Sequence, residues 1–419
     1  MDKYIVNGGK PLSGEIRIHG AKNSVLPILA ASVITGKESV IADCPDLSDV
    51  RESLEILKHL GCKVSSELGT VTVNSETLDR NEIPEYLMLK MRSSVIFLGA
   101  LISRCKGGKI TLPGGCEIGP RPIDLHLFAL REMGIRIEES GGIISCDAKD
   151  IHPASIHLEF PSVGATENIM LAATGADGLT VISNAAKEPE IKDLEDYLKK
   201  TGVKIYGAGT DKIYIYGQKK FEPCFHRVIP DRIEAATYIC GALMTGGRVT
   251  IKNTKAEHME AFYSALSECG ANFRLSGDEA LILPSHDISA IKRVRTYPYP
   301  GFPTDMQSVF MSLMTTAHGT SMIVENVFRD RFRQVDPLVR MGADIVTDGN
   351  VAIIRGVPHL SGAHVAAADL RGGAALTVAA LSASGTSEIE KICYIERGYE
   401  AFDENLRSLG ADIKKEVMI

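Results

Sequence analysis

The stretch YLKKTGVKI at residues 197–205 decides the fold, because five other stretches of the chain repeat its pattern. Each copy places apolar residues around one glycine, and successive glycines stand 68 to 73 residues apart. A second glycine lies 23 to 26 residues before each of them, ahead of a short extended run. Self-similarity at a nearly fixed spacing predicts six copies of one structural repeat. The marker glycines are Gly61, Gly134, Gly202, Gly270, Gly342 and Gly410.

Each repeat is predicted to contain two helices of different character. The first helix is apolar on most faces, as in SVLPILAASVI at residues 24–34, and this composition predicts burial inside a domain. The second helix is amphipathic, as in LEDYLKK at residues 194–200, and ends at the marker glycine, a residue that often follows a helix C-terminus. The alternating run after that glycine, such as DIVTDGNVAII at residues 344–354, predicts a β-hairpin.

Six such repeats predict an α+β protein of two similar lobes, each with three repeats of the βαβαββ type around buried helices. We expect one lobe to cover residues 22–229 and the other to cover residues 1–21 together with 230–419. The run at residues 14–18 is expected to form a leading strand that belongs to either lobe. A cleft between two lobes is a common place for a ligand.

The composition argues against several classes of protein. The net charge of −7 and the pI of about 5.9 disfavour binding to nucleic acid or to an anionic membrane. The longest apolar runs are much shorter than the ~20 residues of a membrane helix, and the first residues do not resemble a secretory signal. Nine cysteines without a CxxC pair, and eleven histidines without a ligand spacing, predict neither disulfides nor a metal site. We therefore expect a cytoplasmic protein with no metal, no nucleic-acid partner and no membrane insertion.

Several of the buried helices are predicted to begin with charged residues. Helix N-termini attract phosphates and carboxylates, and Lys or Arg at the same place adds charge-assisted hydrogen bonds. Asp and Thr at a helix start also have a plainer role, which is to cap the free amide groups. Cationic starts at equivalent positions of three or more repeats favour an anion-binding cleft over capping alone. These starts are Lys22, Arg92, Arg232 and Arg371.

A loop rich in Gly and Pro at residues 112–122 holds Cys116 and Arg121. Its three glycines predict a mobile segment that is suited to act as a lid. A thiol near a cation favours the thiolate, which suits a nucleophile or proton donor. The alternative is that Cys116, like the other eight cysteines, is only a small apolar residue.

A second notable run, VFRDRFR at residues 327–333, interleaves arginines with aromatic residues. Such a run is usually a solvated face, although proteins that bind single-stranded nucleic acid use the same residue types. The acidic charge of the whole chain argues against nucleic acid.

Nine motifs, in order along essentially the whole chain, resemble those of the UDP-N-acetylglucosamine 1-carboxyvinyltransferase family of enolpyruvyl transferases. The resemblance implies two lobes of three repeats each, an inside-out α/β barrel arrangement that closes on its substrates. The motifs are HGAKNSVLPILAA (19–31), LPGGCEIGPRPIDLH (112–126), PSVGATENIM (161–170), AAKEPEI (185–191), PDRIEA (230–235), FPTDMQ (302–307), VFRDRF (327–332), DLRGGAAL (369–376) and IERGYE (395–400).

The activity that the resemblance implies is transfer of the enolpyruvyl group of phosphoenolpyruvate to the 3-hydroxyl of UDP-N-acetylglucosamine, which opens peptidoglycan synthesis. Phosphate leaves by addition and then elimination through a tetrahedral ketal. The two substrates are the implied partners, no cofactor is implied, and the oligomeric state stays open.

The resemblance also assigns roles to residues. Cys116, Asp305, Lys22 and Arg397 are expected to be catalytic, with Asp305 as the base and Cys116 as the loop thiol that forms an adduct with phosphoenolpyruvate and is attacked by fosfomycin. The implied clamp for phosphoenolpyruvate is Lys22, Arg121 and Arg397, with Arg92 and Arg371 nearby. The implied contacts to UDP-N-acetylglucosamine are Asn23, Arg121, Pro122, Ile123, Asp124, Leu125, Ser162, Val163, Gly164, Asp305 and Val327. Glu188, Arg331 and Asp369 are expected to be functional or to stabilise the lid, and Asp231 and Arg232 are further candidate site residues.

One departure and three alternatives accompany this resemblance. Phe160 stands where some relatives carry a basic residue, so a phosphate contact from that position is not expected. The related 5-enolpyruvylshikimate-3-phosphate synthases share the chemistry, but the cysteine loop and the GAKN motif favour the nucleotide-sugar enzyme. A second, divergent copy with weak activity is the alternative within the family. A DNA clamp or binding scaffold built from six repeats is the alternative outside it, although it gives no reason for the cysteine loop.

Overall fold

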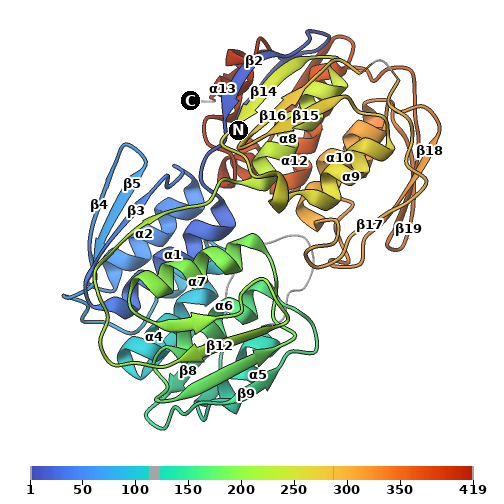
Figure 1. Ribbon diagram of the computed structural model, residues 1–419. Coiled ribbons are helices and arrows are strands. Elements are labelled where there is room, and N and C mark those ends of the chain that lie inside the picture. Colours follow the sequence, from blue (N-terminus) through green and yellow to red (C-terminus); the bar gives the residue numbers. More distant parts are fainter. Residues whose placement is uncertain (1, 113–122, 286, 418–419) are drawn as a thin grey trace. The chain divides into compact units, whose positions relative to one another are not determined.

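The computed structural model describes residues 2–112, 123–285 and 287–417, and Figure 1 shows their path. These residues divide into two compact units. Unit 1 contains residues 2–19 and 230–417, and unit 2 contains residues 20–112 and 123–229. Most of the loop at 112–122, including Cys116, Arg121 and Pro122, lies outside the described residues. Within the described ranges, no helix has both the length and the apolar character needed to span a membrane.

Unit 2 is built from three repeats, each with a buried helix, an outer helix and a small sheet. The buried helices are α1 (Lys22–Thr35), α4 (Phe97–Cys105) and α6 (Val163–Ala173). The outer helices are α2 (Ser48–His59), α5 (Asp124–Glu132) and α7 (Pro189–Lys200), while the short α3 (Glu85–Met88) and the 3₁₀ helix η1 (Arg92–Ile96) precede α4. The strands are β3 (Glu38–Ala42), β4 (Lys63–Glu67), β5 (Thr70–Asn74), β6 (Gly107–Thr111), β7 (Arg136–Ser140), β8 (Ile143–Asp147), β9 (Ser155–His157), β10 (Leu179–Ser183), β11 (Lys204–Tyr206), β12 (Lys212–Tyr216) and β13 (Cys224–Arg227).

The sheets of unit 2 share one plan, in which a hairpin pairs with the strand that follows the buried helix. Their strand orders are β13-β3-β5-β4, β6-β8-β7 and β11-β12-β10-β9. In the first sheet, β13 lies parallel to β3 with Phe225 opposite Val40, although β13 follows the third repeat in sequence. The last strand of the unit is thereby tied to its first repeat.

Unit 1 follows the same plan. Its buried helices are α8 (Arg232–Met244), α10 (Thr304–Met314) and α12 (Leu370–Ser382), and its outer helices are α9 (Glu260–Glu268), α11 (Val335–Arg340) and α13 (Phe402–Ser408), with 3₁₀ turns η2 (Ala256–His258) and η3 (Ile392–Arg397). The strands are β1 (Lys3–Asn7), β2 (Ser13–Arg17), β14 (Arg248–Lys252), β15 (Phe273–Ser276), β16 (Glu279–Ile282), β17 (Val294–Arg295), β18 (Thr320–Val324), β19 (Asp344–Asp348), β20 (Val351–Arg355), β21 (His364–Ala366), β22 (Thr386–Glu390) and β23 (Asp412–Glu416).

The two N-terminal strands complete two different sheets of unit 1. The strand orders are β15-β16-β14-β2, β17-β18-β20-β19 and β21-β22-β1-β23. The leading strand β2 runs parallel to β14, while β1 lies between β22 and β23 and is antiparallel to both. Segments from both ends of the sequence therefore share one sheet of this unit.

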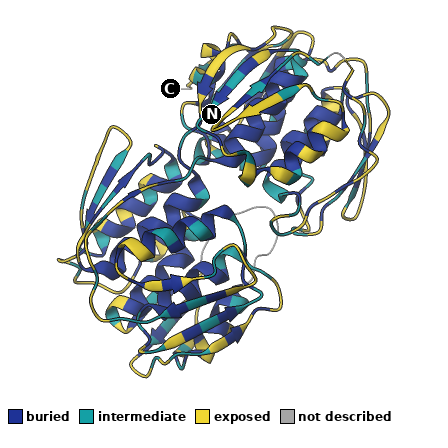
Figure 2. Cartoon of the chain, in the orientation of Figure 1, coloured by how far each residue is buried: buried dark blue, intermediate teal, exposed yellow. Residues whose placement is uncertain are grey.

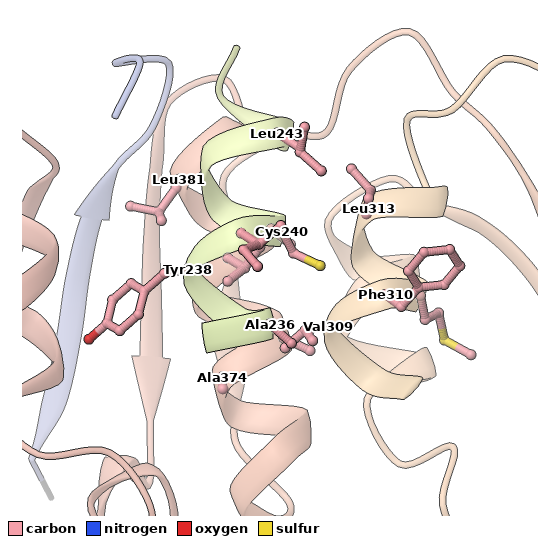
Figure 3. Packing of buried hydrophobic residues seen from close by; sticks show 14 of the residues in the cluster. Ala236, Tyr238, Cys240, Leu243, Val309, Phe310, Leu313, Ala374 and Leu381 are labelled. Atoms are coloured by element: carbon pink, nitrogen blue, oxygen red, sulfur yellow. The ribbon is translucent and has the colours of Figure 1, made fainter. Parts of the chain in front are cut away.

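The apolar first helices form the centre of each unit, as their composition predicts. In α1, every residue except Asn23 is buried, and Figure 2 shows burial concentrated in the helices of both units. Figure 3 shows how α8 packs in unit 1, with Ala236 facing Val309 of α10. Such a helix cannot lie on a surface, because it has no polar face to turn to water.

The marker glycines end the outer helices. All six adopt a left-handed φ between 78° and 94°, a conformation that favours glycine, and the predicted helix ends are confirmed. Two details differ from the expectations. In the second repeat, the apolar run at residues 93–103, which fits the pattern of the buried first helix, begins as the 3₁₀ turn η1, and Cys393 is exposed rather than a small core residue.

Candidate active site

Asp305 is the centre of a charged cluster in unit 1. It is the second residue of α10. Its Oδ1 accepts a hydrogen bond from Nη2 of Arg331 at 2.6 Å, and its Oδ2 accepts one from Nη2 of Arg371 at 3.3 Å. Both arginine side chains are only 3% exposed, whereas that of Asp305 is 27% exposed. Two buried cations therefore hold a carboxylate that is still open to solvent.

The starts of α8 and α12 lie close to this carboxylate. Asp231 caps α8 by accepting hydrogen bonds from two backbone amides at 2.8 and 3.1 Å, and Asp369 caps α12 in the same way at 3.0 and 2.9 Å. Burial lowers the pKa of Arg371, but Tyr399, Asp305 and Asp231 outweigh burial and raise this pKa above its ordinary value. Asp231 and Asp369 thus act as helix caps, as the plainer of the two predicted roles has it. Arg371, which lies beside them, keeps its positive charge.

Three buried atoms of this cluster have no hydrogen-bond partner within the described part of the chain. They are Nη1 of Arg371, Nε of Arg331 and Oδ2 of Asp369. Buried polar atoms are nearly always satisfied, so such atoms are typical of a site that water or a ligand completes. The two arginine nitrogens can donate to an anion or to water, whereas Oδ2 of Asp369 can only accept a hydrogen bond.

The basic run at residues 327–333 is not a solvated face throughout. Arg329 is exposed, but Arg331 is buried against Asp305, with its guanidinium carbon 5.8 Å from the centre of the Phe328 ring. The interpretation as a solvated face is therefore wrong for Arg331, because pairing with a carboxylate compensates its burial. Val327 is partly buried, and its backbone amide donates to Oε1 of Glu325 at 2.8 Å.

The remaining predicted arginines of unit 1 lie at the start of α8 and at the end of η3. Arg232 is the first residue of α8, is buried, and has its guanidinium carbon 5.6 Å from the centre of the Tyr299 ring. Arg397 is the last residue of η3 and is partly buried. Tyr399 follows two residues later and shares a 2.8 Å hydrogen bond with the hydroxyl of Thr237.

Lys22 begins α1 in unit 2 and is held by an acidic partner. Its Nζ lies 2.7 Å from Oδ2 of Asp49, and both side chains are buried. Two residues further along α1, the Ser24 hydroxyl donates to Asp193, whose other oxygen pairs with His226 at 2.9 Å. These contacts fix the first turn of α1 and so fix where the ammonium group of Lys22 lies.

A buried histidine lies beside the starts of η1 and α6. Nδ1 of His126 lies 2.9 Å from Nδ2 of Asn168, and Oδ1 of Asn168 accepts the backbone amide of Gly99 at 2.6 Å. A Cβ added to Gly164 would lie 3.1 Å from Cε1 of His126, so the ring packs against the bare Cα at the start of α6. Burial and the nearby charge of Arg92 lower the pKa of His126 to about 4, so the ring is neutral at pH 7.

The depressed pKa of His126 predicts a specific loss of stability in acid. Between pH 6.5 and about 4 the unfolded chain binds a proton that the folded chain refuses, so the free energy of unfolding falls as pH falls, by up to about 3 kcal/mol from this group. Chemical denaturation should show a shallower pH dependence for His126→Gln than for wild type in this window. The exposed His359→Gln variant is the control. Equal pH dependence in wild type and His126→Gln would contradict the assignment.

The predicted nucleotide-sugar residues of unit 2 that the structure describes lie at the starts of three helices, α6, α5 and α1. Ser162 caps α6, and its hydroxyl accepts the amide of Ala165 at 3.3 Å, with Val163 and Gly164 partly buried in the first turn. Ile123, Asp124 and Leu125 lie at the start of α5, with Asp124 exposed. Asn23, the second residue of α1, is partly buried. Phe160, from which no phosphate contact is expected, is exposed.

Three glutamates are near enough to interact electrostatically where α6 packs against the start of α7. Burial, together with the charges of Glu190 and Glu188, raises the pKa of Glu167 well above its ordinary value. Glu188 is the N-cap residue of α7, and Glu190 is in its first turn. No group of His, Cys, Asp or Glu among the described residues could hold a metal ion.

The structure gathers the predicted residues into separate clusters. It unites Asp231, Asp305, Arg331, Asp369 and Arg371 in unit 1, and it places Arg92 near the start of α6 in unit 2. Sequence reasoning missed four partners, of which His126 and Tyr399 lie inside quoted motifs while the other two do not. The missed residues are Asp49, His126, Glu325 and Tyr399.

Comparison with known proteins places the chain in a family. A family model described as EPSP synthase (3-phosphoshikimate 1-carboxyvinyltransferase) matches residues 6–406. UDP-N-acetylglucosamine 1-carboxyvinyltransferase 2 of Caldanaerobacter subterraneus subsp. tengcongensis is 50% identical over 413 residues, which cover 99% of each chain. UDP-N-acetylglucosamine 1-carboxyvinyltransferase 1 of Carboxydothermus hydrogenoformans is 47% identical over 416 residues, which cover 99% of this chain and 98% of that one. The chain belongs to the UDP-N-acetylglucosamine 1-carboxyvinyltransferase family.

Solved structures confirm the predicted enolpyruvyl transferase fold. The enolpyruvyl transferase NikO from Streptomyces tendae matches with a TM-score of 0.90 at 24% identity, and covers 100% of this chain and 99% of its own. EPSP synthase from Acinetobacter baumannii matches with a TM-score of 0.77 at 18% identity, and both chains are fully covered. At these identities the likeness establishes the fold alone.

Membership of the UDP-N-acetylglucosamine 1-carboxyvinyltransferase family identifies this chain as a transferase and confirms the resemblance of its nine motifs. For a member of this family, the cluster of unit 1 offers a solvent-accessible carboxylate that can accept a proton from a bound hydroxyl. The same cluster offers buried guanidinium groups that can bind an anion.

Proposed function

We propose that this chain transfers the enolpyruvyl group of phosphoenolpyruvate to the 3-hydroxyl of UDP-N-acetylglucosamine and releases phosphate, in peptidoglycan synthesis. The observation that carries the proposal is the name shared by relatives that are 50% and 47% identical over nearly the whole chain. That name states both the acceptor and the transferred group.

Asp305 is proposed as the base for the sugar hydroxyl. In the addition step, the 3-oxygen bonds to C2 of phosphoenolpyruvate, the hydroxyl proton goes to a base, and C3 receives a proton from an acid. In the elimination step, the bond from C2 to the phosphate oxygen breaks and C3 gives up a proton, which restores the double bond. Arg331 and Arg371 each bind one oxygen of Asp305, so they fix the direction in which this carboxylate faces.

Cationic groups are proposed to bind the anions of both substrates. Phosphoenolpyruvate brings a phosphate and a carboxylate, and the acceptor brings a diphosphate, so several cations are needed to offset their repulsion. Lys22, Arg92, Arg371 and Arg397 are the proposed cations among the described residues. Asp49 supports this role because it holds the ammonium group of Lys22 in place.

Cys116 is proposed as the loop thiol that attacks or protonates phosphoenolpyruvate. It lies outside the described residues, together with Arg121 and Pro122, for which substrate contacts are proposed. A Cys116→Ala variant separates two roles for the thiol. Loss of the first turnover identifies a proton donor, whereas loss of steady-state turnover alone identifies an aid to product release.

The identity of the product tests this proposal. NMR of the isolated product is expected to show an enolpyruvyl ether on the 3-oxygen of the sugar, and a 3-deoxy analogue of UDP-N-acetylglucosamine should bind without forming product. An enolpyruvyl group on another oxygen, or turnover of the 3-deoxy analogue, would contradict the proposed acceptor group.

A further inference from the structure

Glu325 is a buried carboxylate that joins three segments of unit 1. It follows β18 directly and is 3% exposed. Oε1 accepts hydrogen bonds from the hydroxyl of Thr296 at 2.8 Å and from the amides of Val327 and Phe328 at 2.8 and 3.1 Å. Oε2 accepts one from the hydroxyl of Thr304 at 2.9 Å. All four groups donate to the carboxylate, so one side chain fixes the end of β17, the start of α10 and the segment after β18.

Two of these contacts, with Thr304 and with Phe328, connect Glu325 to the surroundings of Asp305. Thr304 is the first residue of α10 and directly precedes Asp305. Phe328, whose backbone amide donates to Glu325, has its ring near the guanidinium group of Arg331, and Arg331 in turn binds Asp305. The carboxylate of Glu325 therefore sets the position of Asp305 and of one of the cations that hold it.

The repeat itself does not require this glutamate. In four other repeats, the residue directly after the equivalent strand has a left-handed φ of 55° to 57° and is at least partly exposed to solvent. In the remaining repeat, Leu112 also lacks a positive φ but is exposed, so what sets Glu325 apart from all the other repeats is its burial. A departure from the repeat beside Asp305 points to a task of the site rather than of the architecture. The four equivalent residues are Asp43, Asn184, Asn253 and Lys391.

We propose that Glu325 is a positioning residue for the acceptor side of the reaction, an inference that rests on the proposed function. It holds Asp305, the proposed base, and Val327, a proposed contact of UDP-N-acetylglucosamine, in one fixed relation. None of its four contacts involves Lys22 or Arg397, the proposed cations for phosphoenolpyruvate. Its loss is therefore expected to affect one substrate much more than the other.

Steady-state kinetics of Glu325→Ala test this inference. The KM for UDP-N-acetylglucosamine is expected to rise about tenfold and kcat to fall about 10²-fold, because a shift of about 1 Å in a positioned group has effects of this size. The KM for phosphoenolpyruvate is expected to change by less than about twofold. Glu325→Gln should recover most of the loss, since its amide oxygen can accept from both backbone amides while its amide nitrogen donates to the Thr304 hydroxyl.

Ser321→Ala is the matched control. Ser321 lies in the same strand, is buried, and its hydroxyl accepts the amide of Ile291 at 3.0 Å, so its loss also leaves a buried amide without a partner. This variant is expected to lose stability and to keep both KM values. If Glu325→Ala does not fold, Glu325→Asp, whose shorter carboxylate cannot reach all four donors, takes its place in the comparison.

Two results would overturn the inference. The first is that Glu325→Ala, or its Asp substitute, changes both KM values equally or changes neither KM nor kcat. The second is that Ser321→Ala reproduces the same selective effect. A failure of the proposed function is distinguishable from both, because then the wild-type protein itself would release no phosphate from phosphoenolpyruvate and UDP-N-acetylglucosamine.

Discussion

Asp305→Asn is expected to lower kcat by about 10²- to 10⁴-fold, which is the usual contribution of a general base. The amide has the size of the carboxylate, and its one oxygen can still accept the hydrogen bond from Arg331, the shorter of the two contacts. Binding of UDP-N-acetylglucosamine should therefore change much less than turnover. Calorimetric titration of the acceptor, beside steady-state kinetics, separates these two quantities.

The control for Asp305→Asn is a carboxylate of the same unit in a different setting. Asp344 forms an ion pair with Arg355 at 3.1 Å on an exposed hairpin, and such pairs contribute little. Asp344→Asn should leave both kcat and binding unchanged. A fall of less than about tenfold in kcat for Asp305→Asn would assign the base to another residue.

Lys22→Met is expected to affect both activity and stability. Loss of a buried charged partner should lower kcat/KM for phosphoenolpyruvate by about 10²- to 10³-fold. It also leaves the buried carboxylate of Asp49 without the ammonium group 2.7 Å away, and breaking a buried pair from one side costs about 3–5 kcal/mol of unfolding free energy. Kinetics and chemical denaturation measure the two effects independently.

A double variant separates function from folding in this pair. Lys22→Met combined with Asp49→Leu removes both charges, and replacing a buried ion pair by apolar residues is often neutral for stability. The double variant is expected to recover most of the unfolding free energy and none of the activity. Recovery of activity along with stability would show that Lys22 serves the fold and not the substrate.

The architecture could be predicted from the sequence because every repeat carries the same marker glycines and the same two kinds of helix. The marker glycines predicted the left-handed residue after each outer helix, and the apolar helices predicted the buried centre of each unit. No pattern in the sequence indicates which strands from distant parts of the chain pair with each other. Residues 3–7 alternate in the way that is common to many strands, so nothing in them indicates that β1 lies between β22 and β23.

The candidate site was predictable only where the motifs name its residues. Asp305, Asp369 and Arg371 lie in motifs and are brought together in the structure. Asp49 and Glu325 lie outside those motifs, and each contacts a side chain that is remote in sequence, namely that of Lys22 and that of Thr304. The basic run at 327–333 is a similar case. Its sequence does not show that Arg331 is buried while Arg329 is exposed, because that difference arises only from three-dimensional packing.

Phosphate release from phosphoenolpyruvate tests the central claim most directly. The purified protein would be assayed with UDP-N-acetylglucosamine and, in parallel, with shikimate 3-phosphate, the acceptor that the description of the matching family model suggests. Release with UDP-N-acetylglucosamine alone is the expected result. Release with shikimate 3-phosphate alone, or with neither acceptor in a folded protein, would contradict the proposed function.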